Sequence, residues 1–161
     1  SVELDRLGIA VTVLNANFVK QLFGDQAHPE VITNPTKKIK TSKPIIIAAG
    51  WKPGCSTDTD AVLIAKTYGA KAIYNLSNID YVYTSDPRTN PDSTKIVTIS
   101  WRDFRKIIGD EWNPGANVPF DPIAAKTAEK LKLVGGFVRG DNLIEVERAL
   151  SAGQFQGTTI Q

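Results

Sequence analysis

The sequence predicts an α/β protein: a mainly parallel sheet with helices on both faces, which makes three layers. Short β-branched segments alternate with segments of helical periodicity, as expected when helical crossovers connect parallel strands. The continuous apolar run at residues 44–50 has the composition of a strand buried on both faces. No internal repeat or linker is found, so we expect a single domain over residues 1–161.

The first half is predicted to form a helix, a polar loop and a strand–helix–strand unit. Apolar residues at helical spacing predict an amphipathic helix over residues 5–22, followed by a solvated polar stretch over 26–43. The strand in the run 44–50 leads into a helix over 58–68, and a second strand follows at 71–76. Together they have the length of a βαβ unit.

The second half continues the alternation after a long polar loop. Ser100 is positioned to open one helix, and Asp121, which precedes a proline, is positioned to open the next. A third strand is predicted at 133–138, then a helix capped by Asp141, then a short final strand at 157–160.

Composition excludes several classes of protein. Hydrophobic residues make up 42% and charged residues 22% of the chain, as in globular proteins that are soluble. No apolar run approaches the roughly 20 residues of a membrane span, and no signal peptide opens the chain, so the cytosol is expected. The net charge of +2 favours neither nucleic acid nor membrane as the main partner. A single Cys55 and a single His28 exclude an internal disulfide and a zinc site, and no metal ligands are predicted.

The segment 50–58 has the composition of an anion-binding loop. It follows a predicted strand and precedes a helix, where free N–H groups and the helix dipole favour an anion. Gly50 and Gly54 allow close approach of the backbone, and Ser56 and Thr57 offer hydroxyl groups. The alternative is that the polar residues are ordinary helix caps. The segment does not match the Walker A pattern.

Two acids stand at the start of the same helix. Asp58 lies nearer the loop and is the better candidate for a carboxylate that orients cations around a phosphoryl group. Asp60 is then left as a cap or a solvated residue.

The segment 78–87 combines tyrosines with Asp86 and admits two interpretations. One is a nucleotide pocket in which a ring packs beside a base and Asp86 accepts from ribose or base. The other is a turn whose aromatic residues pack on the edge of the sheet.

Four segments in this order resemble prokaryotic UMP kinases, a family of the amino acid kinase fold. The family patterns are Pro-x-x-Thr-Thr-Asp, Thr-Asn-Val-Asp-Gly-Val-Tyr-x-x-Asp-Pro, Asp-Pro-x-Ala-Ala-Lys and Gly-Thr-x-Ile. The matching segments here are 50–58, 78–87, 120–126 and 157–160. The opening 5–8 also resembles the helix whose first acid contacts the UMP ribose.

The resemblance implies an enzyme of pyrimidine nucleotide biosynthesis that transfers the γ-phosphoryl group of ATP to UMP, with Mg²⁺. It further implies a cytoplasmic homohexamer. Asp58 would be the catalytic carboxylate that organises the active-site lysine, and Asp121 would support the active site. The UMP-binding residues would be Asp5, Gly50, Trp51, Lys52, Pro53, Gly54, Cys55, Ser56 and Thr57. The ATP-binding residues would be Ser77, Asn78, Tyr83, Asp86 and Lys126.

Two departures from the family pattern stand out. Tyr81 occupies a position where the family usually has glycine. The first strand of the family, its Gly-Gly-Ser loop with a lysine and its second glycine pair are not found, and the chain has no methionine. We therefore expect these residues to be the C-terminal two-thirds of a longer protein and to be inactive alone.

Two other functions stay open on the sequence. One is a kinase for a small carboxylate or carbamate, against which Trp51 and Asp5 argue because they suit a nucleotide. The other is a non-catalytic subunit of the same fold that binds a nucleotide or stores an oxoanion.

Overall fold

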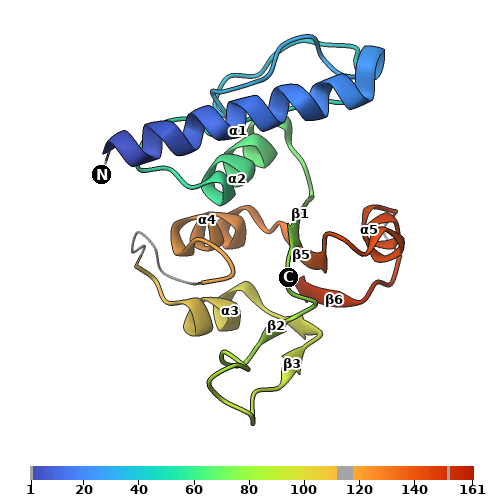
Figure 1. Cartoon of the computed structure of the whole chain (residues 1–161). Helices are drawn as coiled ribbons and strands as arrows, with labels where there is room; N and C mark the ends of the chain where they lie inside the picture. Colours follow the sequence, from blue (N-terminus) through green and yellow to red (C-terminus); the bar gives the residue numbers. More distant parts are fainter. Residues whose placement is uncertain (1, 112–117, 152) are drawn as a thin grey trace. The chain divides into compact units, whose positions relative to one another are not determined.

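The computed structural model describes residues 2–111, 118–151 and 153–161. The chain forms two compact units, residues 1–69 and residues 70–161, each with its own elements (Figure 1).

The first unit contains two α-helices and a short 3₁₀ turn. They are α1 (Val2–Phe23), η1 (Gly24–Gln26) and α2 (Thr57–Tyr68). Helix α2 begins at Ser56, whose hydroxyl accepts a hydrogen bond from the Thr59 amide, and ends at Gly69 in the left-handed conformation (φ 71°). The helices predicted at 5–22 and 58–68 are therefore confirmed.

The strand predicted in the run 44–50 is not formed. Two isolated parallel bridges, Ala27 with Ile45 and Ile32 with Ala48, are its only ladder pairing among the described residues. The partner segment bends between the bridges, where Pro29 has no N–H and the Glu30 amide instead donates to His28 Nδ1 at 3.2 Å. The run is thus extended and half-buried rather than buried on both faces.

Helix α1 has two different faces. One face contacts its own unit and includes the buried Ala16. The other, here termed the apolar seam, carries large side chains that are 56–70% exposed: Leu4, Leu7, Val11, Leu14, Phe18 and Leu22. Contrary to the expectation from apolar runs, the segment Val2–Gln26 is long and apolar enough to cross a membrane by length and composition alone.

The second unit contains a four-stranded sheet and a separate two-stranded pair. In the sheet, in spatial order, lie β1 (Ala72–Ser77), β5 (Val134–Arg139), β6 (Gly157–Ile160) and β4 (Thr98–Ile99). The β1–β5 and β4–β6 pairings are parallel and the β5–β6 pairing is antiparallel. The separate antiparallel pair is β2 (Val82–Tyr83) with β3 (Lys95–Ile96).

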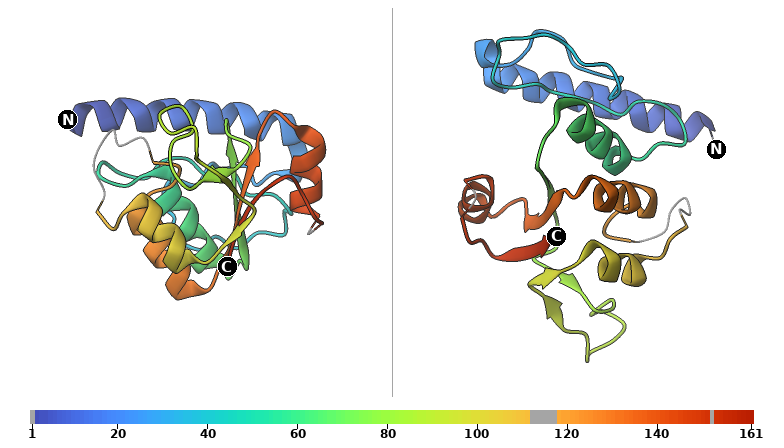
Figure 2. Two further views of the ribbon diagram at one scale, coloured as in Figure 1. Left: turned by 90° about the horizontal axis from the view of Figure 1, so that it is seen from below. Right: turned by 180° about the vertical axis from the view of Figure 1, so that it is seen from behind.

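Helices cover both faces of this sheet, as predicted. Helices α3 (Trp101–Ile108) and α4 (Pro122–Leu131) lie on one side, and α5 (Leu143–Leu150) lies on the other (Figure 2). Ser100 and Asp121 cap α3 and α4 as expected. The cap of α5 is Asn142 and not Asp141, because the Asn142 side chain accepts from the Glu145 amide and Asp141 instead pairs with Arg139.

Glycines in β5 make room for two aromatic rings, one from helix α3 and one from the neighbouring strand β1. A Cβ at Gly135 would lie 2.7 Å from the Trp101 ring, and one at Gly136 would lie 2.4 Å from the Tyr74 ring. On the α3–α4 side the core is an aromatic cluster in which Phe104 and Phe137 stand 5.7 Å apart between ring centroids.

Candidate functional site

Side chains of the two helices in the first unit hold the backbone of residues 50–57, here termed the glycine loop. The loop begins where the Gly50 amide donates to Thr12 Oγ1 at 2.9 Å, and that hydroxyl donates to the Ile9 carbonyl at 2.7 Å. A Cβ at Gly50 would lie 3.0 Å from the same hydroxyl oxygen. Glycine therefore permits the close approach of the loop to α1.

The second anchor is a buried carboxylate on α2. The Trp51 amide donates to Asp60 Oδ2 at 2.9 Å, and Asp60 is only 3% exposed. Burial raises the pKa of Asp60, while the Trp51 amide and the nearby Lys52 charge act in the opposite direction. The sequence had suggested that Asp60 is a helix cap or a solvated residue. The structure shows that it is neither.

The third anchor is Asp5, in the first turn of α1. The Gly54 amide donates to Asp5 Oδ2 at 3.1 Å, and Gly54 adopts φ 81°, which favours glycine. The structure thus brings Asp5, which was expected to contact the UMP ribose, to the glycine loop, where it accepts a hydrogen bond from the loop backbone. Asp5 itself is exposed.

The remaining loop residues lead into the start of α2. The Lys52 ammonium lies over the Trp51 ring, 4.0 Å from its centroid, and the Cys55 amide donates to the Lys52 carbonyl. Ser56 is the N-cap, so the interpretation of this residue as a helix cap is confirmed. Asp58 is half-buried in the first turn of α2. The hydroxyls of Ser56 and Thr57 and the carboxylate of Asp58 therefore lie at this helix start, where the helix dipole favours a phosphorylated ligand.

In the second unit, the carboxyl ends of the parallel strands β1 and β5 lie side by side. Ser77 pairs with Arg139 in register, and the Gly140 amide donates to the Ser77 carbonyl at 2.8 Å. Arg139 pairs with Asp141 at 2.7 Å and with Asp80 at 3.6 Å, which links the loops after the two strands. Ligands bind at such strand ends in open α/β sheets. The exposed Asn78 lies in the first of these loops.

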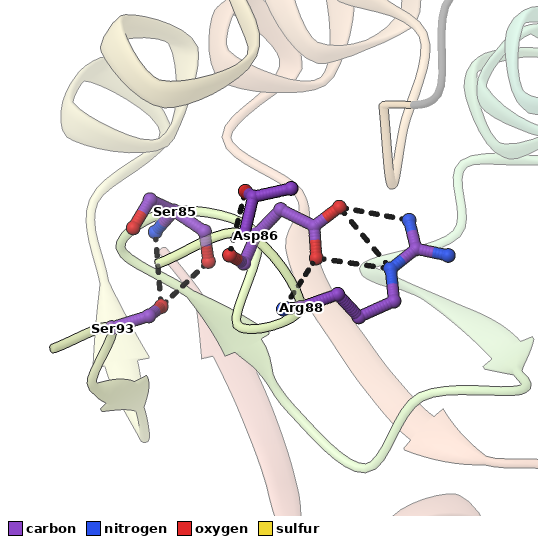
Figure 3. Close-up of polar contacts among 5 residues, drawn as sticks. Ser85, Asp86, Arg88 and Ser93 are labelled. Atoms are coloured by element: carbon purple, nitrogen blue, oxygen red, sulfur yellow. Dashed lines mark hydrogen bonds and ion pairs between the residues drawn. The ribbon is translucent and has the colours of Figure 1, made fainter. Parts of the chain in front are cut away.

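Asp86 is already engaged within its own loop (Figure 3). Its carboxylate accepts from the Arg88 side chain at 2.8 Å and from the Arg88 amide at 2.9 Å. The bonds from Arg88 lower the pKa of Asp86 to about 2. Ser93 Oγ donates to the Ser85 carbonyl at 2.6 Å and closes the same loop.

Tyr81 and Tyr83 flank the start of β2 and have different surroundings. Tyr83 belongs to β2, and Tyr81, which departs from the family pattern, has the Lys95 ammonium 5.0 Å from its ring centroid. Tyr81 thus lies between β1 and β2, and the cation over its ring comes from β3.

Asp121 is 5% exposed and caps α4. Its Oδ1 accepts from the Ile123 amide at 2.6 Å and from the Ala124 amide at 3.2 Å. Lys126 is exposed one turn further along the helix. The predicted UMP residues and Asp58 therefore all lie in the first unit, and the predicted ATP residues and Asp121 all lie in the second.

Sequence reasoning missed three residues that position these segments. Thr12 and Arg139 were not singled out, and Asp60 was expected to be a cap or a solvated residue. Arg139 had a usable signal, because it immediately follows a predicted strand in an α/β pattern. In the parts of the chain that the structure describes, no group of three metal-binding side chains is present.

The amino acid kinase family matches residues 2–134 of this chain. The chain is 32% identical over 160 residues to a uridylate kinase of Methanospirillum hungatei, covering 97% of this chain and 67% of that protein. It is 34% identical to a uridylate kinase of Pyrococcus abyssi, covering 98% of this chain and 71% of the relative. It spans only 55% of the uridylate kinase of Pyrobaculum calidifontis, with which it shares 36% identity over 73% of its own length.

Solved structures with a similar fold include proteins with the same names as these relatives. The fold matches uridylate kinase from Archaeoglobus fulgidus with a TM-score of 0.79 and 27% identity, covering 98% of this chain and 71% of that one. It also matches UMP kinase from Bacillus anthracis with a TM-score of 0.76 over 99% of this chain and 69% of the other, and at 22% identity this match concerns the fold alone.

Proposed function

This chain belongs to the amino acid kinase family, among its uridylate kinases, and we propose that it forms most of an enzyme that transfers the γ-phosphoryl group of ATP to UMP. The products are UDP and ADP. The observation that carries the proposal is the bond between Asp5 and the Gly54 amide, which joins the proposed ribose-binding acid to the glycine loop.

The glycine loop holds UMP in this proposal. Asp5 accepts from the ribose, using the carboxylate oxygen that does not bind Gly54. The start of α2 directs backbone N–H groups and the helix dipole toward the phosphate side of the nucleotide. The remaining loop residues that enclose UMP are Gly50, Trp51, Lys52, Pro53, Cys55, Ser56 and Thr57.

Asp58 supplies the fixed carboxylate of the reaction. Phosphoryl transfer needs little covalent chemistry from the protein, so positioning and charge stabilisation provide most of the rate. Asp58 orients the cations that neutralise charge on the transferring group. Mg²⁺ typically binds one or two carboxylates together with the substrate phosphates, so a single acid such as Asp58 fits this metal without a cluster of protein ligands.

ATP is held by the second unit. Ser77 and Asn78 follow β1 at the strand ends where nucleotides bind in α/β sheets, and Tyr83 and Asp86 complete that side. Because Arg88 already fixes Asp86, we assign to Asp86 the role of shaping the loop as well as facing ATP. Lys126 is exposed on α4 and extends toward the phosphates, while Asp121 secures the start of that helix.

The enzyme is further proposed to act in the cytoplasm, in pyrimidine nucleotide biosynthesis, as a homo-oligomer with the hexamer as the expected form. The exposed apolar seam of α1 supports association, because contiguous exposed apolar side chains commonly mark interaction surfaces. Nucleic acid and membrane are not partners in this proposal.

A coupled assay of ADP release tests the function. The full-length protein is incubated with ATP and Mg²⁺ and with UMP, CMP, AMP, acetate or carbamate in turn. We expect turnover with UMP and at most a small fraction of that rate with the other acceptors. Turnover with acetate or carbamate instead would favour the small-molecule kinase, and UMP binding without any turnover would favour the non-catalytic subunit.

A further inference from the structure

The proposed site leaves one buried group without a role. Asp60 projects from the first turns of α2, is 3% exposed, and has one oxygen, Oδ1, without a hydrogen-bond partner among the described residues. A buried carboxylate with a free oxygen is costly, and such groups are rare in native proteins. Its presence therefore requires an explanation.

The stability of α2 does not supply that explanation. The helix already has an N-cap in Ser56 and a left-handed C-terminal residue in Gly69, and Asp60 lies beyond the cap position. An apolar residue at this buried position would avoid the desolvation cost. The only hydrogen bond that the Asp60 side chain makes to the described chain is to the Trp51 amide, nine residues earlier.

That bond lies near the start of the glycine loop. Gly50 and Gly54 are held from α1 by Thr12 and Asp5, and Trp51 is the position held from α2. Fixing the Trp51 backbone also fixes the point from which the Trp51 side chain extends and the backbone position of the next residue, Lys52. The Lys52 ammonium lies 4.0 Å from the centroid of the Trp51 ring. The charge of Lys52 is the one that acts on Asp60.

We propose that Asp60 is a positioning residue for UMP: its buried carboxylate holds the glycine loop at Trp51 in the conformation that binds the nucleotide. This inference rests on the proposed function of the loop. Asp60 touches no reacting atom, so its removal affects UMP affinity and leaves ATP affinity unchanged. A carboxylate forms a stronger hydrogen bond with this amide than a neutral acceptor would. Its second oxygen is then buried without a partner among the described residues.

Three variants of the full-length protein test the proposal. Asp60→Ala removes the acceptor, and Asp60→Asn restores it through the amide oxygen. Val62→Ala is the control: Val62 is completely buried in the same helix and its aliphatic side chain forms no hydrogen bond, so the change lowers stability while keeping the bond from Trp51 to Asp60. Each variant is measured for hydrogen exchange of the Trp51 amide, for UMP and ATP affinity by calorimetry, and for Tm.

In Asp60→Ala we expect at least about tenfold faster exchange at Trp51 and about tenfold weaker UMP binding, as for loss of a hydrogen bond to a charged group. ATP affinity should stay within about twofold, which is within the spread of a neutral change. Asp60→Asn should recover most of the UMP affinity, and Val62→Ala should lose Tm with unchanged UMP affinity.

Two results overturn the inference while leaving the proposed function intact. One is normal UMP affinity in Asp60→Ala when the wild type binds UMP. The other is an equal loss of UMP affinity in Val62→Ala at matched loss of Tm, which would make the effect one of stability. A wild-type protein that does not bind UMP overturns the proposed function itself, and the exchange data then still decide whether Asp60 holds Trp51.

Discussion

Asp58 and Asp60 differ by two residues on α2 and have different surroundings. Asp58 is half-buried in the first turn beside the glycine loop, whereas Asp60 is buried beneath it and bonded to its backbone. A carboxylate that must orient cations needs access to the ligand, and one that holds a backbone amide does not. The geometry therefore separates the two roles, with Asp58 in chemistry and Asp60 in support.

Replacing Asp58 tests the chemical role. Asp58→Asn keeps the size of the side chain and removes its charge, so kcat should fall about 10²- to 10³-fold, as when a positioned electrostatic group is lost. The KM for UMP should change little, because the lost interaction belongs to the transition state. Steady-state kinetics measure both, with Lys66→Arg, a conservative change at an exposed residue of α2 outside the glycine loop, as the control. Near-normal turnover in Asp58→Asn would remove Asp58 from the mechanism.

The Asp86–Arg88 pair gives a prediction about pH. The folded pKa of Asp86 is about 2, below its ordinary value of 3.8, so the pair stabilises its loop above pH 3.8. That contribution is lost as the pH falls from 3.8 toward about 2. In Arg88→Gln the carboxyl should titrate nearer 3.8, which NMR of the Asp86 carboxyl carbon measures. High salt should shift the wild type in the same direction, because the pair is exposed.

Residues whose roles are local could be predicted from the sequence. Ser56, Ser100 and Asp121 cap helices because a cap depends on the next three residues only. Asp60 could not be predicted in the same way, because its burial depends on the return of the chain to Trp51. No sequence spacing distinguishes this residue from a solvated acid of a first helical turn.

At the scale of elements, the long periodic segments and the final strand β6 (Gly157–Ile160) were predicted, whereas the two-residue strands were not. Helices α1, α2 and α4 and strands β1 and β5 lie within a few residues of their predicted positions. The two-residue strands β2, β3 and β4 were missed, because two residues show no alternation. The run 44–50 was wrongly predicted as a regular strand, since a continuous apolar run does not reveal that its partner bends at Pro29.

The start of α4 gives a prediction at the element scale. Asp121→Ala removes two hydrogen bonds at the helix start and should reduce the free energy of unfolding by about 1–2 kcal/mol, as for loss of an N-cap. Asp121→Asn keeps an acceptor and should lose less. Chemical denaturation measures both variants.

The same two variants separate capping from catalysis. If Asp121 supports the active site only through α4, Asp121→Asn should retain most of the kcat. A large loss of kcat in a stably folded Asp121→Asn protein would instead mean that the charge of Asp121 acts in the reaction.

At the scale of the whole molecule, the proposed nucleotide residues separate by unit. Asp5 belongs to the first unit and Asp86 to the second, so Asp5→Ala should raise the KM for UMP more than that for ATP. Asp86→Ala should do the reverse. Each KM is measured with the other substrate saturating. Equal effects on both constants would show that the UMP and ATP sites are assigned wrongly.

The apolar seam of α1 also concerns the whole molecule. Leu4, Leu7, Val11, Leu14 and Phe18 recur at alternating spacings of three and four, the pattern of helices that pack along a shared seam. Their side chains are 56–70% exposed, while the opposite face of α1 holds the glycine loop through Thr12 and Asp5. One helix therefore connects an association surface to the proposed UMP site.

A charged substitution in the seam tests the proposed homo-oligomer. Leu7→Glu and Leu14→Glu together place two charges on a surface that must lose water when two copies meet, so they should reduce the molar mass measured by light scattering. Asn17→Glu is the matched control, because Asn17 is exposed on the same helix outside the seam. Since the seam and the UMP-binding face share α1, dissociation should also raise the KM for UMP, whereas the control should leave both quantities unchanged. A wild-type protein that is monomeric at micromolar concentration would exclude the homo-oligomer, and an unchanged molar mass in the double variant would place its interface elsewhere.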